Sequence, residues 1–175
     1  MAPDTVAFLR GINVGGHNRV PMADLRALFA DLGHPDAATL VQSGNVLFGA
    51  RGADLVALEA RLEREFATSF GFTSRFVLRA RDELAAVASR NPFPDAEAEP
   101  AKLHVVFLGE VPPAEAVAAL VPSPPDVFVV DGRHVYVNYP AGAGRSKLKL
   151  DLGVAATARN WNTVTRVLEL MGSVG

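Results

Sequence analysis

The chain of 175 residues contains no cysteine. Disulfides and thiolate metal sites are therefore excluded, and this absence is typical of a protein from a reducing compartment. The N-terminus shows neither the basic region nor the apolar core of a signal peptide. No apolar run approaches the roughly 18 residues that a membrane-spanning helix needs. We therefore expect a cytoplasmic protein that does not associate with membranes.

The net charge is also small: its formal value is -2, and the pI is about 6.1. This balance argues against a chain that coats nucleic acid or anionic membranes without specificity. Hydrophobic residues make up 49% and charged residues 21%, as in ordinary globular proteins. The stretch 133–166 is locally basic, since its cations outnumber the single acid, Asp151.

Familiar catalytic and cofactor motifs are missing. The stretch 10–19 does not match the G-x-G-x-x-G pattern of dinucleotide sites, and 142–147 lacks the order of a phosphate-binding P-loop. No G-x-S-x-G segment supports a serine nucleophile. The histidines show no metal-ligand spacing, so we predict no metal and no cofactor, and the sequence leaves open whether the protein is an enzyme. These histidines are His17, His34, His104 and His134.

Hydrophobic periodicity predicts two similar halves. In residues 1–80 it indicates strands over 5–10, 38–41, 46–48 and 73–79, with helices over 22–32 and 54–70. A connecting helix over 81–89 and a proline-rich linker complete 81–100. In 101–175 we expect strands over 102–108, 126–130 and 133–139, a helix over 113–121, a short helix over 146–153 and a last helix over 157–171. The predicted fold is α+β with two ferredoxin-like (βαββαβ-type) halves, the second ending in helices instead of a final strand.

The loop that follows the first strand concentrates glycines, amides and cations. Glycines allow backbone N–H groups to turn toward a ligand, and an arginine at a strand end can bind phosphate or carboxylate. A solvated glycine-rich turn is the competing interpretation. The candidate ligand-binding residues of this loop are Arg10, Gly11, Asn13, Gly15, Gly16, His17, Asn18 and Arg19.

Three further polar clusters are candidates for the same site, although turn chemistry and helix capping are the competing explanations for each. The first forms a hairpin connection, the second a glycine turn before a helix start, and the third the beginning of the last helix. Trp161, inside the third, is expected to be a packing residue. The candidates are Gln42, Ser43 and Asn45; Arg145, Ser146 and Lys147; and Arg159, Asn160, Asn162 and Thr163.

The four clusters carry a family resemblance. The segments RGINVGG at 10–16, QSGNV at 42–46, GRSKL at 144–148 and RNWNTV at 159–164 together resemble the domain-of-unknown-function family 1697, an uncharacterised bacterial family. His17 and the stretch 19–21 depart from the lysine-rich loop of that family. The resemblance implies a compact α+β fold of ferredoxin-like halves and implies no known reaction, substrate or cofactor.

The leading functional hypothesis is that the four clusters meet in one cleft that binds a phosphate-bearing or other anionic small molecule, for example a nucleotide. Positive charge would come from the arginines and Lys147. A less favoured alternative is an RNA-binding module, because ferredoxin-like sheets also recognise RNA through strand aromatics. A third is a protein-interaction scaffold whose polar motifs only hold loops. The sequence does not predict the oligomeric state.

Overall fold

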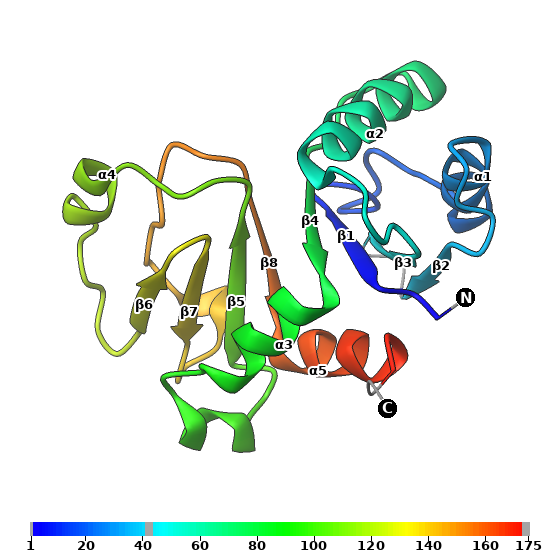
Figure 1. The fold of residues 1–175 in the computed structure, drawn as a ribbon. Coiled ribbons are helices and arrows are strands. Elements are labelled where there is room, and N and C mark those ends of the chain that lie inside the picture. The colour runs from blue at the N-terminus through cyan, green and yellow to red at the C-terminus, as the bar shows by residue number, and fades with distance from the viewer. Residues whose placement is uncertain (1, 41–43, 173–175) are drawn as a thin grey trace. The chain divides into compact units, whose positions relative to one another are not determined.

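The computed structural model describes residues 2–40 and 44–172 (Figure 1). The chain divides into two compact units, Met1–Leu84 with Val167–Gly175, and Ala85–Arg166. The division falls inside two helices, α3 (Arg81–Ser89) and α5 (Trp161–Leu170). Each unit is described by itself. No helix in the described ranges is long and apolar enough to cross a membrane.

Unit 1 is a complete β-α-β-β-α-β arrangement. Its elements are β1 (Thr5–Leu9), α1 (Met22–Asp31), β2 (Ala38–Leu40), β3 (Asn45–Phe48), α2 (Leu55–Phe70) and β4 (Phe76–Ala80). The strands form one four-stranded sheet in the order β2-β3-β1-β4, and every neighbouring pair is antiparallel. This is the split βαβ topology predicted for the first half.

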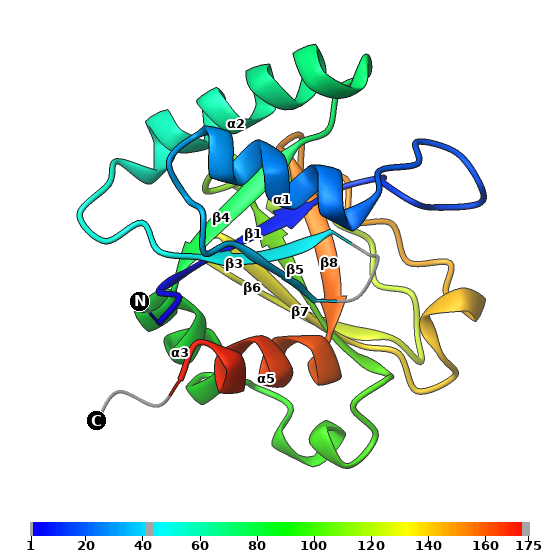
Figure 2. The ribbon, with the colours of Figure 1, turned by 90° about the vertical axis from the view of Figure 1, so that its right-hand side faces the viewer.

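The core of unit 1 lies between its sheet and its two long helices, which cover the same face of the sheet in Figure 2. Phe29 of α1 meets Phe48 of β3 edge to face, with ring centroids 5.0 Å apart. Phe66 of α2 meets Phe76 of β4 in the same way at 5.6 Å. Two of these rings belong to the apolar faces of helices and two to the helix-covered face of the sheet. The 3.6-residue period of the helices and the 2-residue period of the strands therefore direct apolar side chains into the same core.

The ends of α2 follow from local chemistry. Asp54 precedes the helix, and its carboxylate accepts hydrogen bonds from the backbone N–H groups of Val56 and Ala57 at 3.0 and 3.2 Å. Gly71 ends the helix with φ at 75°, a left-handed conformation that favours glycine. The predicted bounds of this helix are confirmed within one residue.

Unit 2 repeats the topology of unit 1. Its elements are the 3-10 helix η1 (Pro94–Ala98), β5 (Leu103–Leu108), α4 (Ala114–Ala118), β6 (Val127–Asp131), β7 (His134–Asn138), the 3-10 helix η2 (Ala143–Arg145) and β8 (Ala156–Asn160), followed by α5. The strand order β6-β7-β5-β8 matches that of the first sheet position by position. The predicted Asp131-Gly132 hairpin turn is confirmed, with φ at 58° for Gly132.

The α+β fold with two ferredoxin-like halves is confirmed, but the predicted ending of the second half is wrong in one respect. A fourth strand, β8, lies where the sequence predicted the first turn of the last helix, and α5 follows it directly. The strand pairs with β5 from Ala156↔Leu108 to Asn160↔His104. Residues 156–160 have little intrinsic strand preference, so the free edge of β5 decides their conformation.

The predicted helix over 146–153 is also absent, and the segment runs as an irregular connection. Its sequence alternates polar and apolar residues, which is the two-residue period of extended chain rather than a helical one. Leu148 and Leu150 pack against the core cluster of unit 2 and Leu152 belongs to it, while Lys147 and Lys149 are exposed. The alternation therefore places leucines inward and lysines outward.

Candidate functional site

The loop after β1 folds into a small hairpin. His17 donates its backbone N–H to the Val14 carbonyl oxygen at 3.0 Å, and these two residues form an isolated antiparallel bridge. The two residues between them, Gly15 and Gly16, have φ at 59° and 77°. Positive φ at both central positions is the condition of a type I′ turn, so this glycine pair explains the tight reversal.

Two asparagine side chains hold the base of this hairpin. The Asn13 side-chain amide donates to the Val20 carbonyl oxygen at 3.0 Å, and its oxygen accepts the Val20 backbone N–H at 2.8 Å. Asn18 donates its side-chain amide to the Gly11 carbonyl oxygen at 3.1 Å. Both asparagines have positive φ, 52° and 53°, a conformation that asparagine adopts more readily than most residues. Their amides are therefore structural as well as polar.

A pocket of about 370 Å³ opens between this loop and the start of α1. Arg19 is its charged lining residue, and Asn13 and Gly16 contribute polar surface. The N-cap residue of α1 is Pro21, which offers no side-chain hydrogen bond to the first turn. The first N–H groups of α1 therefore have no side-chain cap, and Asp24 donates its backbone N–H to the Pro21 carbonyl oxygen at 3.1 Å. The pocket is lined by Asn13, Gly16, Arg19, Val20, Pro21 and Met22.

Arg10 stands at the root of the loop. Its backbone N–H donates to the Arg75 carbonyl oxygen at 3.1 Å, and its own carbonyl oxygen accepts the Ser74 hydroxyl at 2.8 Å. The Arg10 side chain is exposed. Since Arg10 and Arg19 are joined by a stretch without any acid, the loop surface is cationic; the nearest acid along the chain is Asp24, in the first turn of α1.

The turn before β3 touches the root of the same loop. Gly44 lies so close to Leu9 and Ile12 that a Cβ atom there would stand 2.9 Å from the Leu9 Cβ. Asn45 is fully buried and donates its side-chain amide to the Leu40 carbonyl oxygen at 3.0 Å, which makes it a structural residue. The predicted site residues Gln42 and Ser43 lie outside the described residues.

In unit 2, the cluster at 145–147 lies in a turn that side-chain hydrogen bonds hold in place, and not at the start of a helix. The Ser146 hydroxyl donates to the Asp126 carboxylate at 2.6 Å and accepts the Leu148 backbone N–H at 3.0 Å. Arg145 is exposed at the end of η2. Lys147 lines a pocket of about 440 Å³ together with Lys149 and Asp151.

The cluster at 159–163 marks the passage from β8 into α5. Asn160 accepts the Thr163 backbone N–H on its side-chain oxygen at 3.0 Å, so it caps the helix. Trp161 is buried, with 5% of its surface exposed, as expected for a packing residue. Asn162 is exposed and Thr163 half-buried.

Arg159 is held close to its own strand. Its guanidinium Nη1 donates to the Thr157 hydroxyl at 2.7 Å and to the Ala158 carbonyl oxygen at 2.8 Å. Burial lowers the pKa of Arg159 to about 10. The predicted meeting of all four clusters in one cleft stays a prediction.

Sequence analysis missed a second arginine of the same kind. Arg79 in β4 is fully buried, and its Nη1 donates to the Leu78 carbonyl oxygen at 2.8 Å. A buried arginine is rare unless its donors are satisfied. The duplication could have pointed to Arg79, because Arg79 and Arg159 are each the fourth residue of the last strand of their unit. Each of these strands leads directly into a helix.

His104 is half-buried in β5. Its Nδ1 is buried and has no hydrogen-bond partner among the described residues, and the ring packs edge to face against Tyr139 at 5.2 Å. Burial lowers the pKa of His104, opposed by a weaker effect of the Lys102 backbone. Burial therefore favours the neutral imidazole. In the described part of the chain no group of histidine, aspartate or glutamate side chains is arranged to hold a metal ion.

Comparison with known proteins agrees with the fold and adds no activity. Residues 3–136 match a family described as "Protein of unknown function (DUF1697)". A solved structure of the conserved bacterial protein SP0830 from Streptococcus pneumoniae superimposes with a TM-score of 0.78 at 24% sequence identity, covering 97% of this chain and 98% of that chain. This likeness supports the fold. No protein with a curated description matches the chain.

Proposed function

The chain belongs to the DUF1697 family of proteins of unknown function, and we propose that this member binds a phosphate-bearing or other anionic small molecule, such as a nucleotide. The proposed site is the pocket of about 370 Å³ between the loop 10–19 and α1. That pocket is the single observation that carries the proposal, because a cation, a glycine turn and a helix start without a capping side chain all border it.

The contacts assign different roles to the residues in and around the pocket. Asn13 and Asn18 are engaged in holding the loop, so they keep its shape. Arg19 is exposed at the pocket and supplies a planar, permanently charged fork that suits phosphate oxygens. The backbone N–H groups at the start of α1 add uncharged donors. Arg10, exposed at the root of the loop, adds a second positive charge to the surface that an anion approaches.

The charged and hydrogen-bonding groups around the pocket favour a ligand that carries several oxygens. Asp24 in the first turn of α1 opposes a simple anion by repulsion, so a ligand must gain more from oriented hydrogen bonds than it loses to this carboxylate. A phosphate group offers three acceptor oxygens and meets that condition better than chloride or acetate. If chemistry follows binding, electrostatic stabilisation of a phosphate suits these residues better than acid–base catalysis.

A ligand screen tests the proposal. Thermal unfolding is recorded with and without AMP, ATP and inorganic phosphate, for the unaltered protein and for Arg19→Ala. Arg61→Ala serves as a matched control, because Arg61 is an exposed arginine on α2 of the same unit and lies outside the pocket. We expect stabilisation by a phosphorylated ligand, its loss in Arg19→Ala, and its retention in Arg61→Ala.

Two results contradict the proposal. One is the absence of stabilisation by any phosphorylated compound. The other is binding that Arg19→Ala leaves intact. Binding of a short RNA with a steep dependence on salt concentration, without binding of mononucleotides, would favour the RNA-binding alternative instead, because contacts to several phosphates release counterions.

A further inference from the structure

A second pocket of unit 1, of about 380 Å³, lies at the beginning of β1, whereas the loop 10–19 follows its end. Four charged residues line it, and they carry both signs: Asp4 and Asp82, Arg51 and Arg81. Its apolar lining consists of three alanines, Ala50, Ala53 and Ala80, together with Leu55. No candidate residue from the sequence motifs belongs to it.

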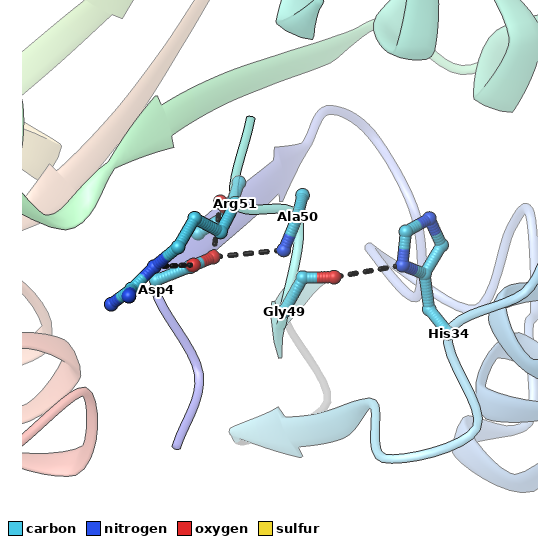
Figure 3. Close-up of polar contacts among 6 residues, drawn as sticks. Asp4, His34, Gly49, Ala50 and Arg51 are labelled. Atoms are coloured by element: carbon cyan, nitrogen blue, oxygen red, sulfur yellow. Dashed lines mark hydrogen bonds and ion pairs between the residues drawn. The ribbon is translucent and has the colours of Figure 1, made fainter. Parts of the chain in front are cut away.

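Asp4 presents one fixed carboxylate oxygen at this pocket. Its Oδ1 accepts the Ala50 backbone N–H at 2.8 Å, as Figure 3 shows. The same oxygen accepts the Thr5 hydroxyl at 3.0 Å. These bonds orient the carboxylate. Its Oδ2 faces the Arg51 Nε at 3.7 Å, and the Arg51 side chain is 85% exposed. An ion pair this long and this exposed contributes little, so Oδ2 can accept a stronger cationic partner.

Arg81 presents the opposite charge. It is the first residue of α3, and its backbone N–H donates to the Asp4 carbonyl oxygen at 2.8 Å, which anchors the residue beside Asp4. The half-buried Arg81 side chain makes no hydrogen bond or ion pair with any residue in 2–40 or 44–172. Its guanidinium offers five N–H donors and no acceptor. The pocket therefore combines an oriented acceptor with an uncommitted donor.

The mixture of charges decides the class of ligand. An anion alone would be repelled by Asp4 and Asp82, and a cation alone by Arg51 and Arg81. A molecule with both charges satisfies both sets. We propose that this pocket binds a free α-amino acid with a small apolar side chain, its carboxylate on Arg81, its ammonium on the Oδ2 of Asp4, and its side chain against the alanines.

The proposal goes beyond the anion site and is tested with three probes that differ in charge. L-Alanine carries both charges, L-alaninamide keeps the ammonium without the carboxylate, and N-acetyl-L-alanine keeps the carboxylate without the ammonium. Binding is followed by calorimetry and by the backbone amide signals of Arg51, Gly52 and Ala53 in NMR spectra. We expect L-alanine to bind at least about tenfold more tightly than either singly charged probe, because each lacks one charge-assisted contact.

Variants assign the contacts. Arg81→Gln should weaken L-alanine binding about tenfold or more, since it removes the guanidinium charge and keeps a polar side chain. Arg61→Gln is the matched control and should leave binding unchanged, because Arg61 is exposed on α2 outside the pocket. Asp4 is not substituted first, because its carboxylate also holds the chain at Ala50. The NMR signals make the test independent of any variant that fails to fold.

Several outcomes overturn the proposal: no binding of L-alanine up to its solubility limit, equal binding of L-alaninamide or N-acetyl-L-alanine, or unchanged binding by Arg81→Gln. Signal changes confined to residues 13–22 would overturn it as well, since they would place the ligand in the other pocket. Arg19→Ala separates the two proposals, because it should abolish nucleotide binding and leave L-alanine binding as it is.

Discussion

Arg79 and Arg159 occupy the same position in two copies of one topology. Each lies opposite a valine of the central strand, Val6 or Val105, and each donates its Nη1 to the carbonyl oxygen of the residue before it at 2.8 Å. Each also precedes a helix by two positions. The pair shows that the duplicated plan extends to an arginine near the end of the last strand of each unit, fully buried at Arg79 and half-buried at Arg159.

Removing the buried guanidinium of Arg79 should destabilise the protein strongly. Arg79→Ala leaves a cavity and takes the donor from the Leu78 carbonyl, and we expect a loss of about 3 kcal/mol in the free energy of unfolding. Arg159→Ala should cost less, because Arg159 is only half-buried. Urea unfolding midpoints measure both. Arg64→Ala is the control, with 66% of its side chain exposed; a loss as large as that of Arg79→Ala would contradict this explanation.

Gly44 should tolerate no side chain. A Cβ atom there would lie 2.9 Å from the Leu9 Cβ, and φ is 77°. Gly52 has the same φ of 77° and open space around its Cα. Gly52→Ala should therefore cost only the left-handed backbone penalty of about 1 kcal/mol, and Gly44→Ala clearly more. Equal losses in thermal unfolding would show that the predicted steric clash is relieved without cost.

Stability should fall above pH 10 because of Tyr136. Burial, followed by the nearby Asp131 carboxylate, raises the pKa of Tyr136 to about 12, and its hydroxyl donates to the Val87 carbonyl oxygen at 2.9 Å. Between pH 10 and the raised pKa the tyrosine of the unfolded state loses its proton first, so the free energy of unfolding falls by up to about 1.4 kcal/mol per pH unit. Urea titrations at several pH values measure this slope. Tyr136→Phe should reduce it, and an unchanged slope would assign the effect to other groups.

His104 makes the opposite contribution at acidic pH. Burial lowers the pKa of His104, so below pH 6.5 the unfolded state binds a proton more readily and stability falls as the pH falls. His104→Phe keeps the edge-to-face contact with Tyr139 and removes the unpartnered Nδ1. We expect this variant to be more stable by about 1 kcal/mol and less sensitive to acid. A destabilised variant would indicate that the imidazole has a partner in solution.

Local chemistry accounts for what sequence analysis predicted correctly. Asp54 and Gly71 bound α2, the Asp131-Gly132 pair makes the β6–β7 turn, and hydrophobic periodicity predicted the helices α1 and α2. Each of these signals lies within a few residues of the structure that it specifies. The two adjacent glycines of the loop 10–19 are likewise a local signal, in this case for a tight hairpin turn.

One of the two errors concerns residues whose partner is distant in the chain, and the other a local pattern that was overlooked. Residues 156–160 form a strand because β5, about fifty positions earlier, offers an unpaired edge, and nothing local to Arg159 announces that edge. The leucines of 146–153 alternate with a two-residue period, which the prediction of a short helix there overlooked. Asn13 and Asn18 hold their own loop through side-chain amides, and their predicted role in ligand binding stays a prediction.

The sequence by itself therefore determined the α+β class, the duplicated order of elements and the place of the polar clusters, since these depend on periodicity and on short-range turn chemistry. Tertiary structure alone decided the fourth strand of unit 2 and the burial of Arg79. It also decided the pocket lined by both Asp4 and Arg81, which lie near opposite ends of the first segment of unit 1 in the sequence. These features arise where segments far apart in the chain pair or pack, and the free energy of such contacts belongs to no single segment.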